Sequence, residues 1–182
     1  MDGVREDAMS DYRRVYVPGG TYFFTAVTAG RHPWLGSADG LDAFRIAYRR
    51  VARDRPFNTL AAVVLPDHVH CIWRLPAGDA DFPGRWQRLK RRSAQLLEAR
   101  GYPGPFWQAR YWERLIRDEA DLRAHMDYVH HNPVRHGLVE RAAEWSASSF
   151  HRYVRAGWYA PDWGVTDAAA LDDAVLGAGG DP

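Results

Sequence analysis

Residues 59–75 have the sequence TLAAVVLPDHVHCIWRL. The first seven residues form a near-continuous apolar run, which is typical of a central β-strand. Pro66 and Asp67 then turn the chain, and residues 68–75 predict a second strand. The sequence therefore predicts a β-hairpin in the middle of the chain.

Similar patterns on both sides of this hairpin predict the rest of the fold. The expected elements are a strand at 21–28, a helix at 41–54, a helix at 84–100, a strand at 106–117, a helix at 119–131 that Pro133 stops, and a short helix ending near Val154. The order β-α-β-β-α-β, followed by one more helix, is the split βαβ or ferredoxin-like pattern. We therefore expect an α+β sandwich in which helices pack on one face of an antiparallel sheet.

Length and composition are those of one globular domain. The chain has 182 residues, of which 46% are hydrophobic, and a single cysteine, Cys71. These values exclude a wholly disordered chain and a disulfide framework. No apolar run is long enough for a transmembrane helix, and the first ten residues do not resemble a signal peptide. We expect a cytoplasmic protein with no membrane partner.

Charge is distributed unevenly along the chain. Residues 12–155 hold 23 basic and 14 acidic residues, a net charge of +9. Residues 1–11 have a net charge of −3, and residues 156–182 hold five acids and no base. The high arginine content can reflect a GC-rich genome, but genome composition does not explain why basic and acidic residues are segregated along the chain. A basic body between two acidic tails indicates a polyanion partner. We expect one domain at 12–155 and a partly disordered acidic tail at 156–182.

Two histidines form the first candidate site. Because side chains alternate along a strand, His68 and His70 point to the same face. The opposite face is the expected core face, formed by Val69, Cys71, Trp73 and Leu75. Two imidazoles at this spacing can bind one divalent ion, or they can be polar residues on a solvated face.

The helix at 119–131 carries the second candidate site. At 100° per residue, Leu122, Met126 and Val129 form a buried stripe. A polar edge beside that stripe is formed by Asp121, His125, Tyr128 and Asn132. His130 and His131 do not share this edge, which makes a zinc site on these two histidines an unfavourable alternative. Tyr128 is either a reactive residue or an ordinary half-buried tyrosine.

Basic residues on the helix at 84–100 form the third candidate site. Arg85, Arg88 and Arg92 share one helix face, and Arg91 lies nearby. No acidic residue interrupts this cluster. The face is either a solvated helix surface or a surface that contacts phosphates, because arginine forks match phosphate oxygens.

Two sequence motifs together resemble a known family. Residues 65–70 (LPDHVH) and 128–137 (YVHHNPVRHG) resemble the corresponding motifs of the REP-associated tyrosine transposases, which belong to the single-tyrosine HUH endonucleases. Residues 106–108 (FWQ), 145–149 (WSASS) and Tyr153 also resemble that family. The resemblance covers roughly residues 12–155 and places the HUH motif on a central strand.

The resemblance implies a role for individual residues. His68 and His70 match the two histidines that hold a divalent metal, Mg or Mn, and Asn132 matches the third ligand. Tyr128 matches the nucleophile, which attacks a DNA phosphate and leaves a 5′-phosphotyrosine and a free 3′-OH. Residues four apart share a helix face, so Tyr128 and Asn132 are able to meet one phosphate.

The resemblance also implies the substrate. The family acts on single-stranded DNA beside hairpins formed by repetitive extragenic palindromes, and a monomer acting in cis is expected. Arg85, Arg88, Arg91 and Arg92 are then candidate DNA contacts, and Trp34, Trp86 or Trp107 either stack on bases or belong to the core. The alternative function is hairpin binding without catalytic turnover.

Overall fold

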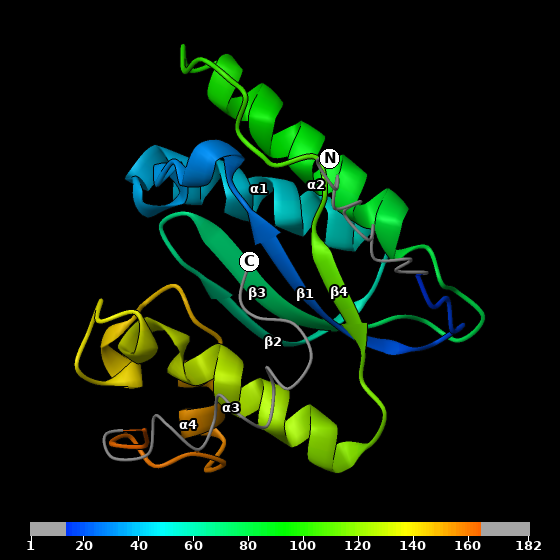
Figure 1. The fold of residues 1–182 in the computed structure, drawn as a ribbon, viewed down its shortest axis with the longest axis vertical. Coiled ribbons are helices and arrows are strands. Elements are labelled where there is room, and N and C mark those ends of the chain that lie inside the picture. Colours follow the sequence, from blue (N-terminus) through cyan, green and yellow to red (C-terminus); the bar gives the residue numbers. More distant parts are fainter. Residues whose placement is uncertain (1–13, 165–182) are drawn as a thin grey trace, which may run out of the picture.

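The computed structural model describes residues 14–164 (Figure 1). Its regular elements are β1 (Thr21–Val27), α1 (Ala38–Asp54), β2 (Asn58–Val64), β3 (His68–Arg74), α2 (Phe82–Glu98), β4 (Trp112–Leu115), α3 (Glu119–Arg135) and α4 (Phe150–Arg155). The four strands pair antiparallel in the order β2-β3-β1-β4. The α+β ferredoxin-like fold is confirmed, and β3 is a central strand.

Helices cover both faces of this sheet, which differs from the expectation. In Figure 1, α1 and α2 lie on one side of the sheet and α3 lies on the other. The α1/α2 side contains the larger apolar core, with Phe24, Trp73 and Trp86. The α3 side has its own core, which includes Phe23 and Val129. The two helices inside the β-α-β-β-α-β pattern, α1 and α2, therefore share one face of the sheet. The helix that follows this pattern, α3, covers the other face.

The pleat of β3 separates its two sets of side chains. Val69, Cys71 and Trp73 lie in the α1/α2 core, as expected. His68 and His70 face the opposite way and are buried beneath α3. The interpretation of these histidines as residues on a solvated face is therefore wrong, because α3 covers that face.

Helix α3 does not end at Pro133. It continues through the proline to Arg135, so Asn132 lies within the helix. The helix ends in a Schellman motif, in which Leu138 N–H donates to the carbonyl of Pro133 and Gly137 N–H donates to the carbonyl of Val134. Gly137 adopts the positive φ of 65° that this ending requires. The termination signal is thus the glycine and not the proline.

The segment at 145–149 protects the free edge of β2. Val64 N–H donates to the carbonyl of Ala147, and Ser149 N–H donates to the carbonyl of Ala62. The Ser149 hydroxyl accepts a hydrogen bond from Ala62 N–H at 2.9 Å. Trp145 Nε1 donates to the carbonyl of Val64 at 2.9 Å. This segment covers an edge strand that would otherwise expose unpaired backbone groups.

The folded region extends beyond the expected boundary at residue 155. Tyr159 and Trp163 pack with Phe150 in a third apolar cluster. Tyr159 Oη donates to the Asp127 carboxylate, and His131 Nε2 donates to the carbonyl of Gly164 at 3.0 Å. Residues 156–164 are therefore part of the domain and dock on the side of α3 away from the sheet. Residues 1–13 and 165–182 lie outside the described residues.

Two truncations separate the docked segment from the acidic residues after it. Deletion after Ala156 removes Tyr159 and Trp163, and we expect it to lower the free energy of unfolding by about 3 kcal/mol. Deletion after Gly164 removes four of the five acids but keeps the docked segment. We expect it to leave stability unchanged. Urea unfolding checks both variants, and a chain truncated after Ala156 that is as stable as the chain truncated after Gly164 would contradict the docking.

No helix among residues 14–164 has the length and apolar character needed to cross a membrane.

Candidate active site

The two histidine rings on β3 lie side by side and are held from behind. Their centroids are 4.8 Å apart. His68 Nδ1 is 2.6 Å from Asp67 Oδ1, and His70 Nδ1 is 2.9 Å from Thr25 Oγ1. An oxygen partner on one ring nitrogen fixes the tautomer and the orientation of a metal-ligating histidine. Both rings therefore have the support that metal ligands have.

His70 is suited to coordination by its charge state. Its burial lowers the pKa of the imidazole well below the ordinary value, and the nearby Arg135 guanidinium acts in the same direction. His70 is therefore neutral at physiological pH, which is the form that coordinates a metal.

Tyr128 lies directly against this pair. Its ring contacts His70 and Phe23 edge-on, with centroid distances of 5.3 Å and 5.9 Å. Only 2% of Tyr128 is exposed. Arg135 Nη1 donates to the phenol oxygen at 3.2 Å. The expected polar edge of α3 therefore exists, but it faces the sheet and is buried with Val129, so Tyr128 does not lie off the buried surface.

Two further members of that edge have structural partners. The Asp121 carboxylate accepts hydrogen bonds from the backbone and side chain of Arg117. His125 Nδ1 donates to the Asp121 carbonyl at 2.7 Å, and its ring packs on Phe23. These contacts fix the start of α3 and its distance from the sheet.

Asn132 is the most unusual polar residue of the site. It is completely buried, and neither its side-chain oxygen nor its nitrogen has a hydrogen-bond partner among residues 14–164. His68 Nε2 is likewise buried without a partner among those residues. A buried unsatisfied amide costs about 1–3 kcal/mol and requires an explanation. A bound divalent ion provides one, so the residues present fit such a group.

No three His, Cys, Asp or Glu side chains cluster closely enough to hold a metal in the described part of the chain. A site that contains both HUH histidines therefore needs a ligand of another type.

Asp67, which the sequence pattern places in the turn before His68, is also a residue of the site. Its carboxylate holds His68 and also accepts a hydrogen bond from Arg31 at 3.0 Å. Partial burial opposes ionisation, but the hydrogen bonds from His68 and Arg31 hold the pKa of this carboxyl below its ordinary value. The sequence signals were its position directly before His68 and its place in the LPDHVH motif. Thr25 gave no signal, because it lies 45 residues from His70.

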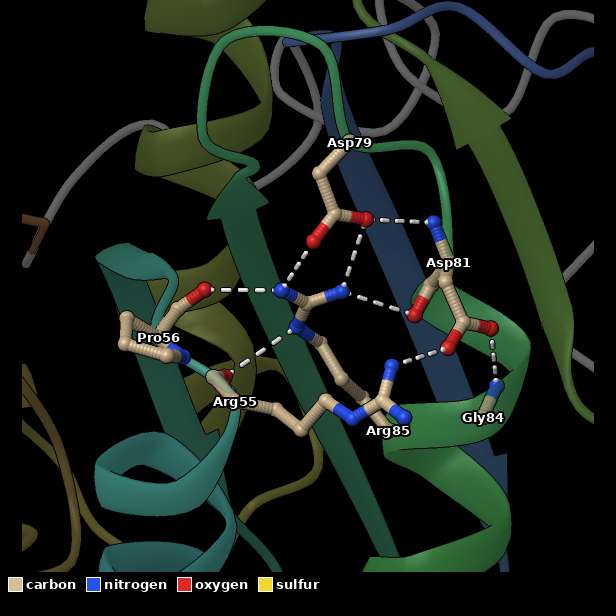
Figure 2. A network of polar contacts seen from close by, with 6 residues as sticks. All are labelled: Arg55, Pro56, Asp79, Asp81, Gly84 and Arg85. Atoms are coloured by element: carbon tan, nitrogen blue, oxygen red, sulfur yellow. Dashed lines mark hydrogen bonds and ion pairs between the residues drawn. The ribbon is translucent and has the colours of Figure 1, made fainter.

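Arg85 is not a DNA contact, and this part of the prediction is wrong. Figure 2 shows its guanidinium enclosed by the 79–81 loop and the chain after α1. Its Nη2 donates to Asp79 Oδ2 at 2.6 Å, and further bonds reach the carbonyls of Arg55, Pro56 and Asp81. Only 1% of Arg85 is exposed. The helix positions place Arg85 on the same face as Arg88, as predicted, but the loop before α2 and the chain after α1 enclose its side chain.

The other arginines of α2 differ from one another. Arg92 Nη1 lies 2.8 Å from Asp54 Oδ2, so it is already ion-paired. Arg91 is exposed and Arg88 is half-buried. Both remain predicted phosphate contacts. They lie on the face of the sheet opposite α3 and Tyr128, and would contact DNA away from the candidate active site.

Substitution of Arg85 should lower stability, whereas substitution of Arg88 and Arg91 should weaken DNA binding. Arg85→Ala breaks an ion pair whose arginine is buried, and we expect the free energy of unfolding to fall by about 2–3 kcal/mol. The loss is smaller than for a fully buried pair because water reaches the Asp79 carboxylate that is left behind. The double substitution Arg88→Ala/Arg91→Ala should change stability by less than about 0.5 kcal/mol per site. It should reduce the slope of log K against log salt by about two phosphate equivalents. An unchanged slope would assign Arg88 and Arg91 to an idle solvated surface.

The three tryptophans proposed as base-stacking residues are mostly internal. Trp86 is completely buried and stacks on Trp73 at 4.7 Å, so it is a core residue. Trp107 is half-buried, with Nε1 donating to Ser93 Oγ at 2.9 Å. Trp34 is 8% exposed and donates from Nε1 to the carbonyl of Phe106 at 2.8 Å.

The alternative zinc site at His130 and His131 is not supported. His130 Nε2 is 2.8 Å from Ser149 Oγ, whereas His131 Nε2 donates to the carbonyl of Gly164. The two rings therefore bind different segments, and both serve to dock the chain that follows α3.

Comparison with known proteins agrees with the fold. No family model matches the chain. A REP-associated tyrosine transposase of Escherichia coli is 46% identical over 164 residues, which cover 89% of this chain and 96% of the relative. A relative of the same family name from Haemophilus influenzae is 42% identical over 167 residues, covering 86% and 94%.

A solved structure of a REP-associated tyrosine transposase bound to a REP hairpin superposes with a TM-score of 0.78. It is 46% identical in sequence and covers 89% of this chain and 96% of that one. The fold, with a buried tyrosine against a histidine pair, thus defines an enzyme of the tyrosine transposase class. At this identity and coverage, the chain belongs to the REP-associated tyrosine transposases.

Proposed function

We propose that this protein is a metal-dependent single-strand DNA endonuclease and strand transferase that cuts near palindromic hairpins. The observation that carries the proposal is the placement of Tyr128 against His70, with the two rings 5.3 Å apart. The hairpin substrate is proposed because the related solved structure is bound to a REP hairpin.

His68, His70 and Asn132 are the proposed ligands of the divalent metal, Mg or Mn. The support comes from the two held imidazoles and from the buried amide of Asn132 without a partner among the described residues. When bound, the ion supplies a positive charge that polarises the scissile phosphate and stabilises the leaving oxygen.

Tyr128 is the proposed nucleophile. Its phenol oxygen attacks phosphorus, the bond from phosphorus to the 3′ oxygen breaks, and the products are a 5′-phosphotyrosine and a 3′-OH. A tyrosine with a pKa of about 10 is only about 0.1% ionised at pH 7. The Arg135 guanidinium, which already donates to this oxygen, favours negative charge on it.

The covalent intermediate also accounts for strand transfer. The phosphotyrosine bond conserves the energy of the phosphodiester, so the 3′-OH of another strand is able to reverse the step. Because one chain holds Tyr128 against His70, a monomer acting in cis suffices for this chemistry.

One experiment separates this function from the alternative of a hairpin-binding protein without turnover. A labelled hairpin with a single-stranded flank is incubated with the protein and Mn²⁺, and the products are resolved under denaturing conditions. We expect label attached to the protein. A shifted band under native conditions with no denaturation-resistant adduct would instead identify a binding protein.

A further inference from the structure

A hollow lies at the end of β1, where the chain that follows this strand is bonded to Asp67, and it is not used by the proposed chemistry. Its volume is about 550 Å³, within the range of about 300–1,000 Å³ typical of ligand sites. One wall is the turn at 29–32 and the other is the loop at 102–106. The lining is mostly aromatic rings, prolines and glycines, with rings contributed by His32, Trp34, Tyr102 and Phe106.

The floor of this hollow is rigid and its rim is accessible. Trp34 and Phe106 are nearly buried, meet edge-on at 5.8 Å, and are linked by a hydrogen bond from Trp34 Nε1 to the Phe106 carbonyl. In contrast, His32 is exposed, and Tyr102 is 42% exposed. Two exposed rings at the rim of a preformed apolar hollow offer flat surfaces at little ordering cost.

The hollow is connected directly to the residues that hold His68. Thr28 N–H donates to the carbonyl of Asp67 at 2.8 Å, and Ala29 N–H donates to the carbonyl of Phe106 at 2.9 Å. Arg31 binds the Asp67 carboxylate, which itself holds His68. The turn at 29–32 therefore forms a wall of the hollow and is fixed to the same aspartate as the candidate metal ligand.

Arg31 supplies a basic group at this junction. Its backbone has a positive φ of 54°, which is uncommon for a residue other than glycine and marks a constrained turn. Its side chain remains 47% exposed while it is paired with Asp67. Arg31 does not line the hollow, but both of its neighbours in the chain, Gly30 and His32, do. A nucleic-acid strand that leaves the hollow toward Asp67 would therefore meet a guanidinium next to an aromatic surface, which is the combination that single-strand binding sites use.

We infer that this hollow binds an unpaired base of the single-stranded flank next to the phosphate that is cut. The base stacks on the exposed rings of Tyr102 and His32, and Arg31 contacts the adjoining backbone. This assignment rests on the proposed function and adds a substrate contact to it.

Binding of two hairpins tests this inference. One hairpin carries the single-stranded flank and the other lacks it, and affinities are measured by fluorescence anisotropy with Ca²⁺ to prevent cutting. Loss of a base-stacking ring typically weakens binding roughly ten- to hundredfold. We expect that loss for the flanked hairpin in His32→Ala and Tyr102→Ala, and unchanged affinity for the hairpin without a flank.

Two matched variants define what the rings contribute. Tyr102→Phe loses the hydrogen bond to Asp39 but keeps the ring, and it should bind as the wild type does. Trp158→Ala removes another exposed ring, 60% exposed and not part of the hollow, and should have no effect. 2-Aminopurine placed in the flank should be quenched by the wild type and less by Tyr102→Ala.

The failure of this inference is distinguishable from failure of the proposed function. If Tyr102→Ala and His32→Ala bind and cut the flanked hairpin as the wild type does, the base site is wrong and the nuclease function stands. Quenching of a base in the hairpin loop, with no effect in the flank, would also overturn the assignment. If the wild type forms no covalent adduct with either hairpin, the proposed function itself fails.

Discussion

Tyr128→Phe is expected to form no covalent adduct with hairpin DNA. The substitution removes the phenol oxygen that accepts a hydrogen bond from Arg135, on the ring that lies against His70, so adduct formation should fall by at least about 10³-fold, to the limit of detection. Metal binding and hairpin affinity should stay near those of the wild type. Arg135 loses one acceptor, and we expect a stability cost of about 1 kcal/mol, which a urea titration measures.

Other tyrosines provide the controls for this variant. Tyr48→Phe, Tyr111→Phe and Tyr153→Phe should each still form an adduct. Tyr153 is the best matched, because its hydroxyl also accepts a hydrogen bond from an arginine, Arg152, and its ring packs against the α3-side core. Peptide mapping of a trapped adduct gives the direct test. DNA attached to any tyrosine other than Tyr128 would refute the assignment.

His68→Ala and His70→Ala are expected to abolish metal-dependent cleavage. Each removes one proposed ligand, and we expect the cleavage rate to fall by at least about 10³-fold while hairpin affinity changes by less than about threefold, since backbone contacts dominate affinity. Both histidines are buried, so each substitution should also reduce stability. Calorimetric titration with Mn²⁺ should show that binding is lost in both.

Asn132 offers a sharper control for the same site. Asn132→Leu replaces a buried amide, unsatisfied within the described structure, by an apolar side chain of similar size. If the amide is present for a metal, this variant should be as stable as the wild type or more stable without metal, yet bind Mn²⁺ weakly. A large loss of stability in the absence of metal would show that Asn132 has a structural role. Equal losses of DNA binding and cleavage in the histidine variants would lead to the same conclusion for His68 and His70.

Properties within a single element could be predicted from the sequence. The period of two in β3 correctly placed His68 and His70 on one face and Val69 on the core face. The 100° spacing in α3 likewise placed Tyr128 on the same edge as Asn132 and separated both from His130. These predictions succeeded because they depend only on the backbone geometry of one strand or one helix.

Contacts between distant segments were decided by the tertiary structure alone. Local periodicity did not indicate that α3 covers the histidine face, that Thr25 holds His70, or that the chain after α1 helps to enclose Arg85. Nor did it indicate that the chain after Ala156 docks on α3. The physical reason is common to all four: local periodicity gives the direction of a side chain from its own backbone, whereas burial depends on which other segment packs there.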